Sequence, residues 1–169
     1  NKKYINGSLV HYCSAVLTSE FNNSGTVHVA NTGGLTISAG NTTGTSDTGV
    51  YAVSNSGGSL TFSGGTRTFA STSEFGGPGA FTFSNGIIIF DNVTMNTTGA
   101  VNLTGGTLST SNTNMSITAS TIDIADTLDL GTGDLTILNS GSGNIALGDD
   151  AVGTFKLDDS ELGNITANN

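Results

Sequence analysis

Short groups of apolar residues recur along the chain, each with the form apolar, polar, apolar, and Gly, Asn, Ser and Thr separate one group from the next. Such a group is a minimal β-strand, because alternate side chains of a strand point to opposite faces. Helical spacing at i, i+3 and i+4 is not sustained in the sequence. The pattern therefore predicts an all-β chain built from many short strands.

The apolar groups repeat about every 20–21 residues, a period typical of solenoid repeats. Three sets of positions are expected to stack from turn to turn and form the core. They are Leu60, Phe81, Val101, Ile122, Ile145 and Ile165; Ile87, Leu108 and Leu128; and Val93, Met115, Leu135 and Phe155. Three sets in phase predict a parallel β-solenoid with three short strands per turn and corners of residues that tolerate tight turns.

An antiparallel sandwich is the alternative all-β architecture, but it needs longer alternating strands with a turn about every 8 to 12 residues. Many gaps between apolar groups are only about 6 to 8 residues, which suits one side and one corner of a solenoid. We expect a single solenoid domain over residues 27–169, with corner loops near 41–49 and 71–79. Residues 1–26 are expected to form an irregular first turn or cap.

Composition agrees with a thin core and a polar exterior. The chain has 169 residues, of which 35% are hydrophobic, whereas Gly, Thr, Ser and Asn together make up about half. The chain has 4 Lys and Arg residues and 13 acidic residues, so its net charge is -9. This is too few cations for nucleic-acid binding. No apolar run reaches the roughly 18 to 20 residues of a membrane span. A surface of hydroxyls, amides and aspartates favours an extracellular location.

Several strand and corner units carry a family resemblance: "LTISAGNTTG", "LTFSGGTRTF", "VNLTGGTLST" and "DLTILNSGSGNIAL". They resemble the β-strand repeats of large bacterial surface proteins related to filamentous haemagglutinin, the passengers of two-partner secretion. The C-terminal "LDDSELGNITANN" is similar to a motif of such proteins in which an acidic "SEL" segment precedes an "ITA" strand. The resemblance implies a right-handed β-helix, secretion, and work as an adhesin or filament.

Four aspartates in one predicted turn, Asp123, Asp126, Asp129 and Asp134, form the first candidate site. Asp123 and Asp129 each lie between two inward apolar residues, so they are expected to point outward from two different sides of the rod. Diverging side chains are poor ligands for calcium, which needs oxygens at about 2.3–2.6 Å. We therefore expect solvated aspartates and no cofactor; a weak calcium site at Asp123, Asp126 and Asp129 is the alternative.

Two carboxylate pairs, Asp149 with Asp150 and Asp158 with Asp159, raise the question of polysaccharide hydrolysis. An inverting glycosidase needs two carboxylates about 6.5–9.5 Å apart, and neighbours on one strand point to opposite faces. Cationic partners are also scarce, with Lys156 alone in this part of the chain. The sequence therefore predicts no enzymatic activity.

His11, Cys13 and His28 are too few for a four-ligand zinc site, and we expect them to be structural. The chain starts without a Met or a leader-like segment and ends soon after Ile165 without an evident polar cap. We therefore expect material excised from a longer precursor, in which neighbouring modules or identical subunits continue the rod end to end.

The functional hypothesis is a structural β-helix of an extracellular or cell-surface adhesin or filament, acting through polar faces and rod ends. Host-surface or matrix glycans are candidate ligands, whereas nucleic acid and membrane insertion are not expected. The alternative is a carbohydrate-binding or carbohydrate-processing β-helix, such as a segment of a phage tail fibre or of a polysaccharide hydrolase.

Overall fold

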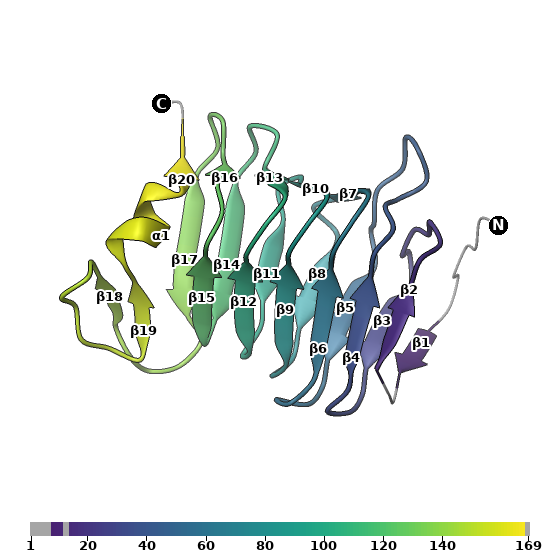
Figure 1. The fold of residues 1–169 in the computed structure, drawn as a ribbon, viewed down its shortest axis with the longest axis horizontal. Coiled ribbons are helices and arrows are strands. Elements are labelled where there is room, and N and C mark those ends of the chain that lie inside the picture. Colours follow the sequence, from purple (N-terminus) through teal and green to yellow (C-terminus); the bar gives the residue numbers. More distant parts are fainter. Residues whose placement is uncertain (1–7, 12–13, 168–169) are drawn as a thin grey trace.

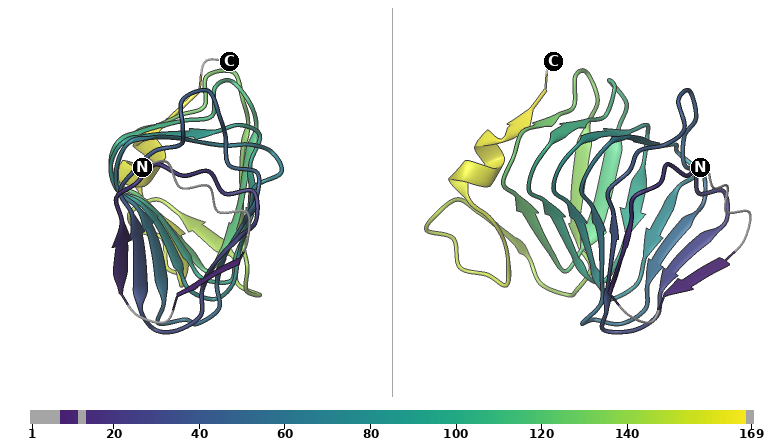
Figure 2. Two further views of the ribbon diagram at one scale, coloured as in Figure 1. Left: turned by 90° about the vertical axis from the view of Figure 1, so that its right-hand side faces the viewer. Right: turned by 45° about the vertical axis from the view of Figure 1, so that its right-hand side comes forward.

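In the computed structural model the chain is a β-solenoid of about six turns with three strands per turn, as predicted. The structure describes residues 8–11 and 14–167. All strand pairs within it are parallel, and each strand pairs with its counterpart about one turn away (Figure 1). The strands of neighbouring turns superpose in the view along the rod (Figure 2, left).

Three parallel sheets form the sides of the solenoid, and they are numbered here in the order in which the chain first enters them. Sheet 1 contains β1 (Ser8–His11), β3 (Thr26–Val29), β5 (Val50–Val53), β8 (Glu74–Gly76), β11 (Thr94–Asn96), β14 (Met115–Ala119) and β17 (Leu135–Asn139). Sheet 2 contains β2 (Ala15–Leu17), β4 (Gly34–Ile37), β6 (Ser59–Phe62), β9 (Ala80–Phe83), β12 (Ala100–Leu103) and β15 (Thr121–Ile124). Sheet 3 contains β7 (Thr66–Phe69), β10 (Ile87–Phe90), β13 (Thr107–Ser109), β16 (Leu128–Asp129) and β20 (Ile165–Thr166).

The core is a column of inward side chains that repeat from turn to turn. Within sheet 2, Leu60 pairs with Phe81, Phe81 with Val101 and Val101 with Ile122, and all four side chains are buried. Aromatic rings stack in the same way; the rings of Phe62 and Phe83 lie 5.1 Å apart and nearly parallel. Layered packing of this kind buries each apolar side chain against its neighbours above and below, so few are needed.

Glycines form the corner between sheet 2 and sheet 3 in three successive turns. Gly65, Gly86 and Gly106 lie between sheet 2 and sheet 3 in successive turns, and their φ values are 70°, 91° and 93°. This left-handed region is open to glycine and disfavoured for residues with a Cβ. A Cβ at Gly86 would also lie 2.4 Å from the Gly65 carbonyl oxygen. The repeating glycine therefore allows both the turn and the close approach of the turns.

The expected second core set needs a correction of one residue. Ile88, not Ile87, pairs with Leu108 and is buried, whereas the Ile87 side chain is 45% exposed on the outer face of sheet 3. Residues 87–90 read Ile, Ile, Ile, Phe, so the apolar pattern shows no alternation there. A shift of one residue along a strand moves every side chain to the opposite face. Leu108 then pairs with Leu128, as expected.

The expected core sets also break down after β17. Ile145 pairs with Phe155 in a separate two-stranded sheet formed by β18 (Ile145–Leu147) and β19 (Phe155–Leu157). Ile165 pairs with Leu128 in sheet 3. Val93, directly before β11, lies beside Met115, and Met115 pairs with Leu135 in sheet 1, but Phe155 does not follow Leu135. The extra strand β18 and its loops shift the later residues out of phase, which a simple period in the sequence does not reveal.

The expected domain limits also differ from the structure at two places. β1 and β2 already pair with β3 and β4, so the solenoid begins before residue 27. The segment 71–79, expected to be a corner loop, contains β8, and its Phe75 is buried in the core. Segment 41–49, by contrast, is a loop between β4 and β5 that projects from the rod (Figure 1).

A short helix covers one strand edge at the C-terminal end. Helix α1 (Asp159–Gly163) begins with a capping box, in which Asp158 accepts from the Glu161 amide and Glu161 accepts from the Asp158 amide. The second Glu161 oxygen accepts from the Ile124 amide at 3.2 Å, and the Asn164 amide group donates to the Ile124 carbonyl at 2.7 Å. The expectation that this end has no polar cap is therefore wrong for sheet 2.

The one-residue correction in β10 leads to a matched pair of variants. Ile88→Ala is expected to lower the free energy of unfolding by about 2–5 kcal/mol because it leaves a cavity in the core column. Ile87→Ala is expected to change it by less than about 0.5 kcal/mol because that side chain faces solvent. Urea unfolding of both variants measures the difference, and equal losses would contradict the assigned register.

Candidate functional site

Two of the four aspartates that the sequence singled out accept hydrogen bonds from nearby backbone amides in local turns. Asp126 accepts a hydrogen bond from the Thr127 amide at 2.7 Å, and Asp129 accepts one from the Gly131 amide at 2.9 Å. Asp123 lies exposed on the outer face of β15. Among the side chains that the structure describes, in residues 14–167, no three His, Cys, Asp or Glu residues gather in a group that could hold a metal ion. The calcium alternative therefore gains no geometric support.

The two later carboxylate pairs have separate structural uses. Asp158 is the N-cap of α1. An Asp149 oxygen accepts from the Asp159 amide at 3.1 Å, and Lys156 donates to the Asp149 backbone carbonyl rather than to a carboxylate. The remaining Asp150 side chain is exposed. These contacts tie the loop between β18 and β19 to β19 and to the first residue of α1.

His28 lies on the outer face of β3, where its Nε2 hydrogen-bonds with the Ser54 hydroxyl. Cys13 lies outside the described residues, and of His11 the structure describes the backbone pairing with Val29. The structure therefore does not describe how the side chains of these three residues lie relative to one another.

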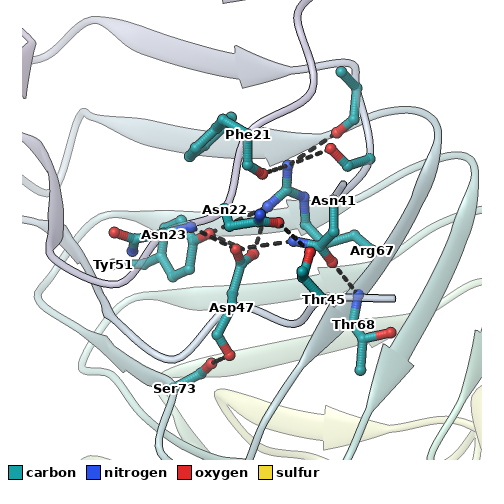
Figure 3. A network of polar contacts seen from close by, with 12 residues as sticks. Phe21, Asn22, Asn23, Asn41, Thr45, Asp47, Tyr51, Arg67, Thr68 and Ser73 are labelled. Atoms are coloured by element: carbon teal, nitrogen blue, oxygen red, sulfur yellow. Dashed lines mark hydrogen bonds and ion pairs between the residues drawn. The ribbon is translucent and has the colours of Figure 1, made fainter. Parts of the chain in front are cut away.

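A buried ion pair between Arg67 and Asp47 is the most distinctive polar feature of the described chain (Figure 3). The two side chains are 1% and 0% exposed. Arg67 comes from β7 and points inward, whereas Asp47 comes from the loop between β4 and β5. An ion pair in such a place stabilises the fold only when its remaining donors and acceptors are also satisfied.

Most of the polar atoms around the pair have partners. Tyr51 donates its hydroxyl to Asp47 at 2.6 Å, and the second Asp47 oxygen accepts from the Asn23 backbone amide at 2.7 Å and from the Asn41 side chain at 2.9 Å. Arg67 donates to the Ala39 carbonyl at 3.0 Å. Burial raises the pKa of Tyr51 well above its ordinary value, and the neighbouring Asp47 charge raises it further, so Tyr51 remains a donor.

Aromatic rings enclose the guanidinium group. Its central carbon lies 4.8 Å from the centre of the Phe21 ring and 5.7 Å from that of Phe62. Such cation–π contacts are stronger where water is excluded. Arg67 Nε alone, among the buried side-chain nitrogens and oxygens of the described residues, has no hydrogen-bond partner.

The ion pair joins the projecting loop to sheet 3. The Asp47 amide donates to the Thr68 carbonyl at 2.8 Å, and the Ala70 amide donates to the Asp47 carbonyl at 2.9 Å. Asn41 closes the other end of the loop, since its amide donates to the Thr66 carbonyl and its side-chain oxygen accepts from the Thr68 amide at 2.6 Å. The loop ends thus take the place of a sheet 3 strand beside β7.

Sequence reasoning missed this network because it treated Arg67 only as one of few cations. The alternation in β7, which reads Thr, Arg, Thr, Phe, places Arg67 on the same face as the buried Phe69. A cation on the apolar face of a strand needs an anionic partner inside, and that signal could have pointed to the loop aspartate.

No protein-family model, no curated protein and no solved structure matches the chain. The structure shows a β-solenoid repeat protein, and the resemblance to haemagglutinin-related surface proteins rests on the sequence units alone.

Removing either charge is expected to destabilise the protein strongly, because the other charge then remains buried and uncompensated. Asp47→Asn and Arg67→Met should each lower the free energy of unfolding by about 3–5 kcal/mol, and the double variant should lose less than the sum. The exposed Asp91→Asn serves as the control, with a change below about 0.5 kcal/mol in urea unfolding. A loss for Asp47→Asn as small as that of the control would contradict the role of the pair.

Proposed function

We propose that the protein is a structural section of an extracellular or cell-surface adhesin or filament, and that it acts as a rod without catalytic activity. The observation that carries the proposal is the continuity of sheet 1, which runs from β1 to β17. A solenoid whose sheet continues to its end has a strand edge on which a further turn can pair.

The C-terminal end supports growth along sheet 1 in particular. There, β20 extends sheet 3, and α1 with Asn164 covers the β15 edge of sheet 2. β17 pairs with β14 on one side, and on its other side the described chain supplies no strand. The inward Leu135 and Ile137 are only partly buried, and the outward Leu138 is 51% exposed. An apolar, unpaired edge of this kind is a template for another strand.

Charge is distributed unevenly along the rod. Residues 101–169 carry nine acidic side chains and one Lys, a net charge of -8, whereas residues 1–100 carry four acidic and three basic side chains, a net charge of -1. Two C-terminal ends therefore repel each other more than a C-terminal and an N-terminal end do, which disfavours contact between two C-terminal ends relative to head-to-tail contact. The neighbour in the rod is a further module or an identical subunit.

The polar exterior supports an extracellular setting and distributed binding. Outward positions of sheet 2 carry Thr36, Thr61, Thr82 and Asn102, and Asn102 donates to Thr82 across neighbouring turns at 3.1 Å. Within the described residues, no helix is long and apolar enough to span a membrane.

Turnover of a neutral or acidic polysaccharide that is lost in Asp149→Asn would overturn the non-catalytic part of the proposal.

The open edge of β17 predicts self-association of the isolated protein. Leu138→Lys adds a charge to the edge strand and is expected to weaken association about tenfold, or about 1.4 kcal/mol. Ile87→Lys is the matched control, because it adds the same charge to an exposed isoleucine on the side of the rod. Sedimentation velocity over a range of concentrations measures both.

A wild-type protein that stays monomeric, with β17 amides exchanging as slowly as those of β14, would show that the edge is closed and would contradict the assembly proposal.

A further inference from the structure

A groove lies beside the projecting loop, between its residues 40–46 and the outer face of β7. Its volume is about 570 Å³. The side chains that line it are almost all small and polar, and those used below are Glu20, Asn41, Thr43, Ser46, Thr66 and Thr68. The loop itself projects between β4 and β5 (Figure 1; also Figure 2, right).

Hydrogen bonds hold the loop that walls this groove. Asn22 accepts from the Thr42 amide at 3.1 Å and from the Thr45 hydroxyl at 2.8 Å. Asn41 is bound both to Asp47 and to the Thr68 amide (Figure 3). The buried Arg67 forms the ion pair that holds Asp47, near the end of the loop. A wall that is already ordered loses little conformational entropy when a ligand binds, which raises affinity for a given set of contacts.

The chemistry of the groove selects against anions. Among the described residues that line it there is no Lys or Arg, and Glu20 contributes a negative charge. The Arg67 side chain lies on the inner face of β7 and is 1% exposed, so it is not accessible to a ligand. Phosphate, sulfate and uronate groups would therefore be repelled. Threonine and serine hydroxyls, the Asn41 amide and the Glu20 carboxylate can instead exchange hydrogen bonds with a neutral ligand that carries many hydroxyl groups.

An apolar strip continues the floor of the groove along sheet 3. Ile87 and Ile89 pair with Thr66 and Thr68 in the next turn, and they share the same outer face. The Ile87 side chain is 45% exposed. A polar wall beside an apolar strip matches a sugar ring, which has hydroxyl groups around its edge and C–H groups on its faces. Ligand sites commonly combine an apolar surface with a few placed polar groups.

We propose that this groove binds a neutral saccharide, with its hydroxyl groups against the projecting loop and β7 and a ring face toward Ile87 and Ile89. The inference deepens the proposed surface role by placing ligand binding at one loop, and it rests on that role for the presence of glycans. The buried ion pair then acts as the support that holds the loop in its binding geometry.

The test is an NMR titration of the full chain with uncharged hexasaccharides of glucose, mannose and N-acetylglucosamine, and with a heparin-derived hexasaccharide as the sulfated comparison. At least one neutral hexasaccharide is expected to shift the amides of Thr43, Thr66 and Thr68, with at least tenfold higher affinity than the sulfated one. Thr43→Ala combined with Thr66→Ala should weaken that binding at least tenfold.

Thr104→Ala combined with Thr107→Ala is the matched control, because Thr107 occupies the position of Thr66 two turns away on the same sheet. This control should keep the wild-type affinity. Absence of shifts at about 5 mM of every neutral hexasaccharide, equal binding of the sulfated one, or equal loss in both double variants would each overturn the inference. Sedimentation velocity of the same samples measures rod assembly separately, so failure of the saccharide proposal is distinguishable from failure of the assembly proposal.

Discussion

The turn-on-turn stacking of inward side chains is the constraint on which the rest of the structure depends. Parallel strands in neighbouring turns lie about 4.8 Å apart, so each inward side chain has to fit between its counterparts above and below. The stacked aromatic pairs Tyr51 with Phe75, Phe62 with Phe83 and Phe69 with Phe90 satisfy this requirement with rings nearly parallel. Glycine at the corners has no Cβ that would clash with the backbone of the neighbouring turn, so the corners can stack as closely as the paired strands. A chain with 35% hydrophobic residues can therefore still enclose a continuous core.

The Arg67 and Asp47 pair is an exception within that column, and its position explains why it is tolerated. Sheet 3 begins at β7, and the loop ends at Asn41 and Asp47 lie beside it where a strand would otherwise stand. The ion pair, Tyr51 and the Asn23 amide supply most of the partners of the two charged groups, which leaves Arg67 Nε as the exception. Loops that carry binding residues are usually held by a rigid scaffold, and here the polar network joins the two. The same network thus links the stability of the first turns to the geometry of the outer groove.

Much of the architecture could be predicted from the sequence, because alternation and corner residues are local signals. Leu60, Phe81, Val101 and Ile122 stack as expected, since each lies in a clear apolar, polar, apolar group. The pattern predicts the wrong face for Ile87 because four apolar residues in a row carry no alternation, and the wrong neighbour for Phe155 because β18 is an insertion that breaks the period. Arg67 and Asp47 are 20 residues apart, about one turn of the solenoid, and the inward position of Arg67 indicates that an anion lies inside but does not identify Asp47 as that anion. The groove is formed by the folded loop beside β7, and the loop sequence carries no periodic pattern that predicts this conformation.

The loop between β4 and β5 is a fixed part of the solenoid, held by the buried ion pair. Native-state hydrogen exchange by NMR tests it most directly, because the amides of Asn41, Asp47 and Thr68 bond across the junction between loop and sheet. These amides are predicted to exchange as slowly as the β7 amide of Phe69 and to lose that protection in Asp47→Asn while β14 keeps its own. Exchange of the Asn41 and Asp47 amides within minutes in the wild-type protein, with β7 still protected, would contradict the account.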